Sequence, residues 1–348
     1  MEPWGIAVIC LIIIIFFYAS FCLICVAIAN EKLFGVRGED PHNPIYLRYE
    51  DYEDWMERKP YMCGYYGKAI NGYIYSDKNF KDYKGFIILS HGFFGTHVQY
   101  LFDIAMLAKK GYQVLAYDQF GVGISEGRSQ QALATGIYVL ENVIADVEKK
   151  DINHGLNLYL YGHSWGGYCV VGAMRNHPEI KGVIARSAPM GPGIAGKDLM
   201  KTFAPKLYPF ISQLIRFSSF LILGFRYSIK AKRGFKNKTS PVLLIQAKND
   251  PMVPYCHSLA KYCEDHKKEN VQISVTDKGL HNSLLVEEDQ NQYRTWVKEY
   301  KEIEKIADEK EKTRMEEKFI ASLDRVHSYH YDEDVSKEII DFLEETKK

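Results

Sequence analysis

The chain has 348 residues, of which 47% are hydrophobic, enough for one large domain or two ordinary ones with a sizeable buried core. This composition excludes a chain that is mainly disordered. The 44 lysines and arginines are balanced by 44 aspartates and glutamates, so no basic excess attracts nucleic acid or an acidic substrate. We therefore expect no nucleic-acid partner.

The seven cysteines indicate neither a disulfide scaffold nor a metal site. An odd number cannot all pair with one another, and Cys10, Cys22 and Cys25 lie inside an apolar run. The remaining four lack the spacing of a zinc site; they are Cys63, Cys169, Cys256 and Cys263. No metal ligands are expected.

The first 30 residues have the pattern of a transmembrane helix. The stretch from Trp4 to Ala29 contains no charge and is long enough to cross the hydrocarbon core, about 30 Å thick, with some tilt. A cleaved signal peptide is the alternative, but no Lys or Arg precedes the run and its apolar part is too long. Lys32 and Arg37 follow the run and Glu2 precedes it, which favours a cytoplasmic location for the rest of the chain.

Beyond an acidic and aromatic stretch at 31–66, interpreted as a linker or N-terminal extension, strands and helices alternate. Short apolar runs predict strands at 86–89, 114–117, 156–161, 183–185, 242–246 and 271–275. Amphipathic stretches between them predict helices at 99–110, 131–149 and 165–177. This alternation predicts an α/β fold, in which helices cover both faces of a mostly parallel sheet.

Two segments interrupt the alternation. Residues 190–238 combine ten lysines and arginines with a single acid, Asp198, and many Leu, Ile and Phe, which indicates a basic, apolar helical insertion. Residues 287–330 are dense in Glu and Lys and suit exposed helices with i,i+4 ion pairs. The end of the chain, 331–348, contains an amphipathic helix that would bury Ile339, Ile340, Phe342 and Leu343.

A Gly-x-Ser-x-Gly motif at 162–166 directly follows a predicted strand and precedes a predicted helix. A turn this sharp leaves no room for bulky neighbours, so the glycines allow Ser164 to adopt a strained backbone and expose its hydroxyl. The helix N-terminus behind it favours developing negative charge. We interpret Ser164 as a nucleophile.

A serine nucleophile needs a base and an acid to orient that base, in the chain order Ser, Asp, His. Asp250 follows the strand at 242–246 and His281 follows the strand at 271–275. Both therefore belong to loops at the carboxyl edge of the sheet, where active sites of open parallel sheets lie. Either residue alone could be a turn former or a surface residue; their order and strand context predict a catalytic pair.

An oxyanion hole is predicted from the loop after the strand at 86–89, which carries glycines at 92 and 95. The backbone N–H of Phe93 and that of Trp165, directly after the nucleophile, are the expected donors. His91 is expected to order this loop rather than act as the base.

These motifs resemble the α/β-hydrolase superfamily, and within it the serine hydrolases that include monoacylglycerol lipases, lysophospholipases and the serine aminopeptidase-type group. The resemblance covers about 67–286 and the last helix. The sequence Asp118 to Ser125 is similar to that group's Asp-x-x-Gly-x-Gly-x-Ser loop, with Val122 at a position usually occupied by His. The resemblance implies that 190–238 is a helical cap between hydrolase core segments 67–189 and 239–286, whereas 287–330 lies outside the usual pattern.

The expected function is hydrolysis of a carboxylic ester, with a lipid-like or long-chain acyl ester favoured by the apolar cap and the membrane anchor. Such a reaction requires neither a metal nor an organic cofactor. A peptidase, thioesterase or acyltransferase could use the same triad, because the triad does not define the acyl acceptor. A membrane-anchored binding module without activity is the remaining alternative. Protein partners and oligomeric state are not encoded in any recognisable pattern.

Overall fold

The fold is built on a twisted sheet of eight strands within the part of the chain that the computed structural model describes, residues 2–35, 37–38, 43–203, 205–206, 208–236 and 239–347. The strand order is β1-β2-β4-β3-β5-β6-β7-β8. β1 pairs antiparallel with β2, and β2 pairs antiparallel with β4; the other pairings are parallel. The strands are β1 (Met56–Tyr65), β2 (Lys68–Asp77), β3 (Gly85–Ser90), β4 (Tyr112–Tyr117), β5 (Leu158–His163), β6 (Gly182–Arg186), β7 (Val242–Ala247) and β8 (Val271–Thr276).

The six predicted strands are all present, but the expectation of a linker at 31–66 is wrong for its last part. β1 pairs with β2 along its whole length, and the two-residue turn between them places Tyr66 and Gly67 at positive φ. Such a turn matches the twist of a hairpin. β1 is an edge strand with many polar residues and Pro60, a composition that edge strands tolerate and that conceals them in the sequence. Residues 36 and 39–42 of the expected linker lie outside the described residues.

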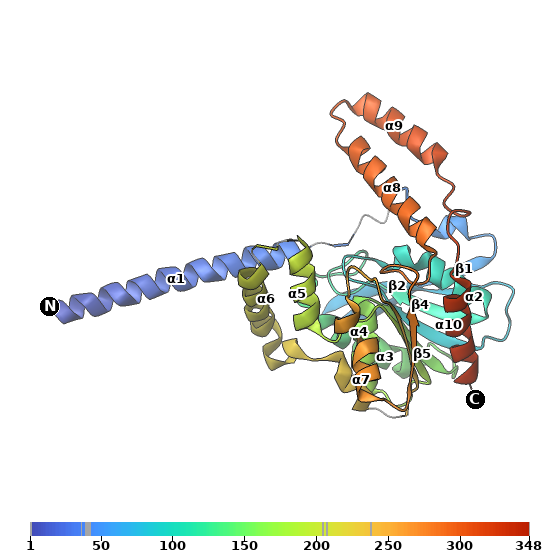
Figure 1. Cartoon of the computed structure of the whole chain (residues 1–348), viewed down its shortest axis with the longest axis horizontal. Coiled ribbons are helices and arrows are strands. Elements are labelled where there is room, and N and C mark those ends of the chain that lie inside the picture. Colours follow the sequence, from blue (N-terminus) through green and yellow to red (C-terminus); the bar gives the residue numbers. More distant parts are fainter. Residues whose placement is uncertain are drawn as a thin grey trace.

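Helices cover both faces of the sheet, as the alternation predicted. One apolar layer joins the sheet to α3 (Thr135–Lys149), α4 (Trp165–Ala173) and α7 (Leu259–His266). The opposite layer joins it to α2 (Leu101–Lys109) and α10 (Glu333–Glu345). In α10, Ile339, Phe342 and Leu343 are buried and Ile340 is partly buried, as the amphipathic pattern predicted. Figure 1 shows α10 and α2 on one side of the strands and α3, α4 and α7 on the other.

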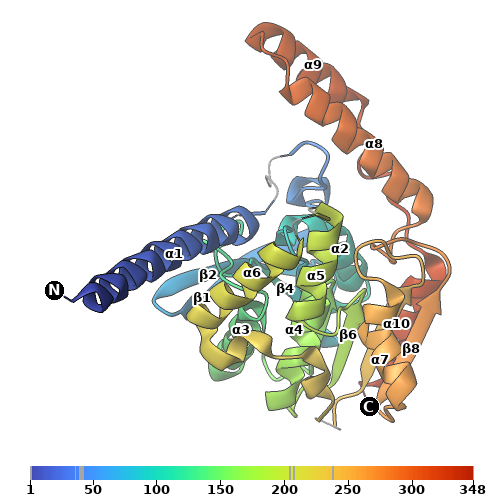
Figure 2. The same cartoon turned by 60° about the vertical axis from the view of Figure 1, so that its left-hand side comes forward.

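The N-terminal helix α1 (Pro3–Phe34) projects from the body of the protein (Figures 1 and 2). Its apolar side chains are exposed along most of its length, whereas Val26 and Phe34, near its C-terminal end, are buried. Among the described residues, the stretches Pro3–Ile28 and Tyr208–Lys236 are long and apolar enough to cross a membrane by length and composition. An exposed apolar N-terminal helix is thus present, as expected for an anchor or a signal sequence.

The insertion at 190–238 forms α5 (Pro192–Phe203) and α6 (Tyr208–Leu223), followed by two 3-10 segments, Gly224–Ser228 and Ala231–Lys236. The second 3-10 segment returns to the core, where Ala231 and Phe235 pack with α4. α6 contacts α1, and Figure 2 shows it crossing the body beside the base of α1. Residues 204, 207 and 237–238 of the insertion lie outside the described residues.

The charged segment at 287–330 forms a pair of helices, α8 (Glu287–Glu304) and α9 (Glu309–Ser322), that projects from the body (Figure 1). The two helices are not exposed to solvent on every face, because Trp296, Ile303 and Phe319 form a small buried apolar cluster with Ile45. A bridge between Leu285 and Tyr331 closes the base of the pair. The α8–α9 pair is therefore held to the rest of the domain at its base.

The contact between β2 and β4 can be tested with two glycines of the hairpin. A Cβ at Gly72 would lie 2.4 Å from the carbonyl oxygen of Ala116, whereas a Cβ at Gly64 would meet nothing within 4 Å. We expect Gly72→Ala to lower the free energy of unfolding by about 1–3 kcal/mol through overpacking. Gly64→Ala should change it by less than about 0.5 kcal/mol. Thermal unfolding of the two variants beside the wild type measures this, and equal effects would contradict the close approach of β2 to β4.

Candidate active site

Ser164 occupies a strained turn between β5 and α4, as the Gly-x-Ser-x-Gly motif predicted. Its backbone has φ 56° and ψ −119°, a conformation that non-glycine residues rarely adopt. A Cβ at Gly162 would lie 2.3 Å from the Gly166 carbonyl oxygen, and one at Gly166 would lie 1.9 Å from that of Ser90. Only glycine fits at both positions, so the chain reverses tightly and presents Ser164 at the carboxyl edge of the sheet.

His281 and Asp250 are brought together by the loops after β8 and β7. The His281 Nδ1 lies 3.0 Å from Asp250 Oδ1 and 2.9 Å from Oδ2, so the ring donates to a carboxylate whose side chain is fully buried. Burial raises the pKa of Asp250, but the hydrogen bond from His281 and the backbone N–H groups of Val253 and Met252 outweigh it and lower the pKa. The carboxylate is therefore ionised and holds the imidazole through its Nδ1.

Ser164 and His281 line the same cavity, which has a volume of about 140 Å³. The rest of its lining is mainly apolar and aromatic: Phe93, Phe94, Leu133, Trp165, Tyr168, Pro189, Gly191, Pro192, Ala195, Met252 and Val253. Acidic side chains are missing from this lining among the described residues. The cavity thus places a hydroxyl and an imidazole against an apolar wall.

The loop after β3 lies beside Ser164, and a buried histidine orders it. His91 accepts a hydrogen bond at Nε2 from the Gln119 N–H (3.0 Å) and places Nδ1 2.8 Å from the Gly92 carbonyl oxygen. Burial lowers the pKa of His91, so the ring is neutral and orders the loop without serving as the base. The Gly92 N–H donates to the Tyr100 hydroxyl (2.8 Å) and is not free to bind an oxyanion.

Phe93 and Trp165, the two expected oxyanion donors, both line the Ser164 cavity. Their rings meet edge to face with centroids 5.4 Å apart. On its other side the Phe93 ring contacts Phe34 at the end of α1, with centroids 5.7 Å apart. The use of their backbone N–H groups as donors remains a prediction.

His163, which directly precedes Ser164, links Tyr100 to the loop of His281, a role that sequence reasoning missed. Its Nδ1 accepts from the Tyr100 hydroxyl (2.8 Å), and its Nε2 donates to the His281 carbonyl oxygen (2.9 Å). The Ser187 hydroxyl donates to the same carbonyl (2.8 Å). Burial, together with the nearby His281 and Arg186, lowers the pKa of His163 well below its usual value. The neutral ring therefore holds the backbone of His281 in place relative to Tyr100.

A buried ion pair supports the same loop. Arg186 at the end of β6 has no exposed surface and pairs with Asp103 of α2, which also accepts a hydrogen bond from the Tyr161 hydroxyl (2.6 Å). Burial alone would lower the pKa of Arg186, and the Asp103 carboxylate raises it, so the guanidinium stays charged. Arg186 also donates to the side chain of Asn282, next to His281, at 3.0 Å.

Helix α8 contributes one further contact to the loop of His281. Gln290 in the first turn of α8 donates to the carbonyl oxygens of Asn282 (2.8 Å) and Leu285 (2.9 Å). The residues behind the loop also border a cavity of about 270 Å³ that includes His163, His281 and α8 residues Gln290, Tyr293 and Arg294. The sequence signal for these supports was present only as polar residues at strand ends, which is too common to identify them.

The loop at 118–125 has a structural role. Asp118 is buried and accepts hydrogen bonds from the N–H groups of His97 (2.7 Å) and Ile124 (2.9 Å). A Cβ at Gly123, where φ is 46°, would lie 2.0 Å from an Asp118 oxygen. Val122 is buried, so the loop holds its shape with an apolar residue at that position.

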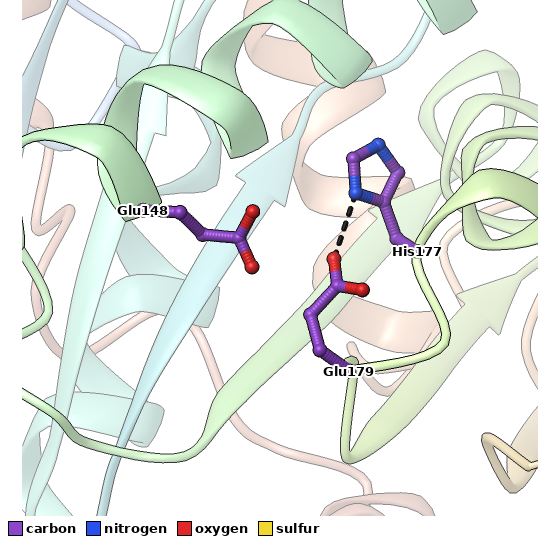
Figure 3. Close-up of side chains that lie close together, drawn as sticks. All are labelled: Glu148, His177 and Glu179. Carbon is purple, nitrogen blue, oxygen red and sulfur yellow. Dashed lines mark hydrogen bonds and ion pairs between the residues drawn. The ribbon is translucent and has the colours of Figure 1, made fainter.

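A separate group, Glu148, His177 and Glu179, lies at the end of α3 and before β6, at the amino edge of the sheet (Figure 3). Its ligand-type atoms lie within 4.8 Å of one another, and the His177 Nδ1 is 2.8 Å from Glu179. Burial and the neighbouring Glu179 raise the pKa of Glu148. Both glutamates are exposed, and the group is at the opposite edge of the sheet from Ser164, so it takes no part in the site.

All seven cysteines are free thiols.

The burial of neutral His163 predicts a loss of stability in acid. The unfolded chain binds a proton at this residue near pH 6.5 and the folded chain does not, so stability falls as the pH drops below about 6.5, by up to about 1.4 kcal/mol per pH unit. We expect His163→Gln to flatten this slope, although it lowers stability at pH 8 by disturbing the hydrogen bonds. Unfolding of the full chain in detergent between pH 5 and 8 measures the slope. An unchanged slope would contradict a neutral His163.

Comparison with known proteins supports this architecture. Residues 81–219 match the sequence profile of the family described as Serine aminopeptidase, S33. A proline iminopeptidase of Thermoplasma volcanium is 34% identical over 102 residues, which are 29% of this chain and 34% of that protein. One of Saccharolobus solfataricus is 31% identical over 104 residues, 29% of this chain and 32% of that protein. The matched region spans about a third of the length of these curated relatives.

Solved structures are similar over a larger part of the chain. An esterase of Pyrococcus furiosus superposes with a TM-score of 0.53 and 22% identity, covering 68% of this chain and 86% of that one. Est1E of Butyrivibrio proteoclasticus, with ferulic acid bound, gives a TM-score of 0.49 and 20% identity over 71% of this chain and 100% of that one. The likeness to the Pyrococcus protein confirms the fold class expected from the sequence.

Proposed function

We propose that this chain, a serine hydrolase of the α/β-hydrolase superfamily, cleaves a carboxylic ester through an acyl-enzyme, with a lipid-like or long-chain acyl ester as the favoured substrate. One observation carries the proposal: His281, held by both oxygens of Asp250, lines the same small cavity as Ser164 on its strained turn. Nucleophile, base and orienting acid are thereby supplied by three separate loops at one edge of the sheet.

In the proposed mechanism, His281 takes the proton of the Ser164 hydroxyl as the oxygen attacks the ester carbonyl. Asp250 orients the ring and stabilises the imidazolium that forms. The N–H groups of Phe93 and Trp165 bind the developing oxyanion. The imidazolium then protonates the departing alcohol, and water, deprotonated by the same ring, releases the acid from Ser164.

The lining of the cavity favours an ester over a peptide with a free amino end. An aminopeptidase must bind a charged amine, which calls for an acidic partner inside the pocket. Acidic side chains are missing from the described lining of the Ser164 cavity. Phe93, Phe94 and Met252 instead offer surface for an acyl chain. The match to an aminopeptidase family therefore supports a serine hydrolase without favouring a peptide substrate.

The exposed apolar helix α1 supports a membrane-anchored enzyme. A buried Phe34 joins its end to the loop of Phe93, so the site lies next to the base of the helix. Substrates that partition into lipid would be concentrated at this position. We propose a single-pass anchor with the hydrolase domain on the cytoplasmic side, where Lys32 and Arg37 would also lie.

The nucleophile can be tested with a fluorophosphonate probe, which reacts with activated serines. We expect wild-type protein to be labelled and Ser164→Ala to lose the label completely, because Ser164 shares its cavity with His281, the proposed base. Ser336→Ala, which removes a hydroxyl on α10, is the matched control and should stay labelled. Folded wild-type protein that resists the probe would favour the alternative of a binding module without activity.

The same purified protein separates the catalytic alternatives. We expect kcat/KM for a p-nitrophenyl acyl ester to exceed that for an aminoacyl arylamide by about 100-fold or more, since the pocket lacks an acidic partner for the amine. A thioester of the same acyl chain and an alcohol acceptor complete the panel. Preference for the arylamide would indicate a peptidase, and acyl transfer to the alcohol would indicate an acyltransferase.

The anchor can be tested with an epitope tag at the N-terminus. We expect the tag to remain on the mature protein and the protein to stay in the membrane pellet after alkaline carbonate extraction, because an apolar helix of this length inserts stably. Removal of residues 3–28 should release the protein into the soluble fraction. Loss of the tag from mature protein would instead identify the helix as a cleaved signal sequence.

A further inference from the structure

We propose that the cavity between the end of α1 and the cap binds a phosphate group of the substrate, and that Arg216, Lys230 and Lys232 are its binding residues. The inference rests on the proposed function and deepens it. It assigns the substrate to single-chain acyl esters that carry a phosphate away from the scissile bond.

This cavity has a volume of about 360 Å³, within the range of about 300–1,000 Å³ typical of small-molecule sites. Phe34 of α1, Ile215 of α6 and Ile194 of α5 contribute to its walls. Leu133, Gly191 and Pro192 line both this cavity and the one at Ser164. The two spaces are therefore neighbours, and a molecule with its ester carbonyl at Ser164 can extend into the cap cavity.

The charge in this second cavity is of one sign. Arg216, Lys230 and Lys232 line it, and acidic side chains are missing from its lining among the described residues. Within the described part of the chain, none of the three lies within ion-pair distance of a carboxylate; the Lys232 ammonium lies over the Tyr262 ring, 4.8 Å from its centroid. Unpaired cations beside an apolar wall attract an anion with a hydrocarbon part.

The single acid of the cap does not neutralise these cations. Asp198 of α5 is 2.7 Å from the His257 Nδ1 and pairs with that ring. Three positive charges around one space suit a phosphate monoester, which carries up to two negative charges and several acceptor oxygens, better than a single carboxylate. We therefore commit to phosphate and treat carboxylate as an outcome of the test.

The position of the cavity explains how such a substrate could enter. α6 contacts α1, and its side chains Phe210, Phe217, Phe220, Leu221 and Ile222 are exposed. With α1 in the bilayer, this face of α6 would meet the membrane surface, where basic residues attract anionic head groups. A single-chain lipid could then pass from the membrane along α6 into the cavity, with its phosphate held by the cap.

The first test compares two substrates with the same acyl chain, a 1-acylglycerol 3-phosphate and the neutral 1-acylglycerol, using the full chain in detergent. We expect wild type to favour the phosphate, and the double variant Arg216→Gln and Lys230→Gln to lower the ratio of the two kcat/KM values by about 10-fold or more, as loss of charged hydrogen bonds implies. The control removes two other cap cations, Lys197→Gln and Lys236→Gln, and should leave the ratio within about 2-fold.

The outcomes separate this proposal from the proposed function. A wild type that hydrolyses both substrates with equal kcat/KM would overturn phosphate recognition and leave the hydrolase standing. If neither substrate is hydrolysed, binding of octyl phosphate, octanoate and octanol to Ser164→Ala protein, measured by calorimetry, decides the matter without activity. We expect octyl phosphate to bind most tightly and the cap double variant to lose that preference. Equal binding of octanoate would assign a carboxylate instead, and equal binding of octanol would overturn the site.

Discussion

The close packing of α4 against the carboxyl end of β3 is the constraint on which the site depends. Gly166 approaches Ser90 so closely that a Cβ would lie 1.9 Å from its carbonyl oxygen. This contact holds the start of α4, and with it Ser164, next to the loop that Ser90 begins. The strain at Ser164 is maintained because relaxing it would separate the helix from the strand. Ser164, the proposed nucleophile, and its expected oxyanion donors are thus positioned by one contact between backbones.

The other half of the site is positioned by buried polar groups. Arg186, Asp103 and Tyr161 form a buried network, and such a network is costly to break because a lone charge would remain buried. Arg186 of this network also donates to the Asn282 side chain, and the neutral ring of His163 donates to the His281 carbonyl oxygen. We infer that this network orients the loop of His281, since hydrogen bonds define direction where apolar contacts define only distance.

The sequence was sufficient to predict the six parallel strands, the helices between them and the meeting of Asp250 with His281, because each rests on a local pattern of apolar runs and glycines. β1 was missed because an edge strand can be polar and can contain Pro60. His163 and Arg186 were missed for a different reason. Their roles depend on partners more than sixty positions away, such as Tyr100 and Asn282. Spacing along the chain does not predict such contacts.

The two elements that extend beyond the hydrolase core, α1 and the α8–α9 pair, each contact a different half of the site. Phe34 at the end of α1 packs on Phe93 in the loop after β3, whereas Gln290 in the first turn of α8 binds the backbone of Asn282 beside His281, the proposed base. Arg37 adds to the first contact, because its guanidinium donates to the Gly123, Ser125 and Gly127 carbonyl oxygens of the neighbouring loop. Because both extensions contact loops that carry the proposed catalytic residues, movement of either one relative to the core would alter the distance between Ser164 and His281. In the proposed enzyme, the membrane around α1 would therefore act on the Ser164 side of the proton transfer, and a molecule that binds the α8–α9 pair would act on the His281 side.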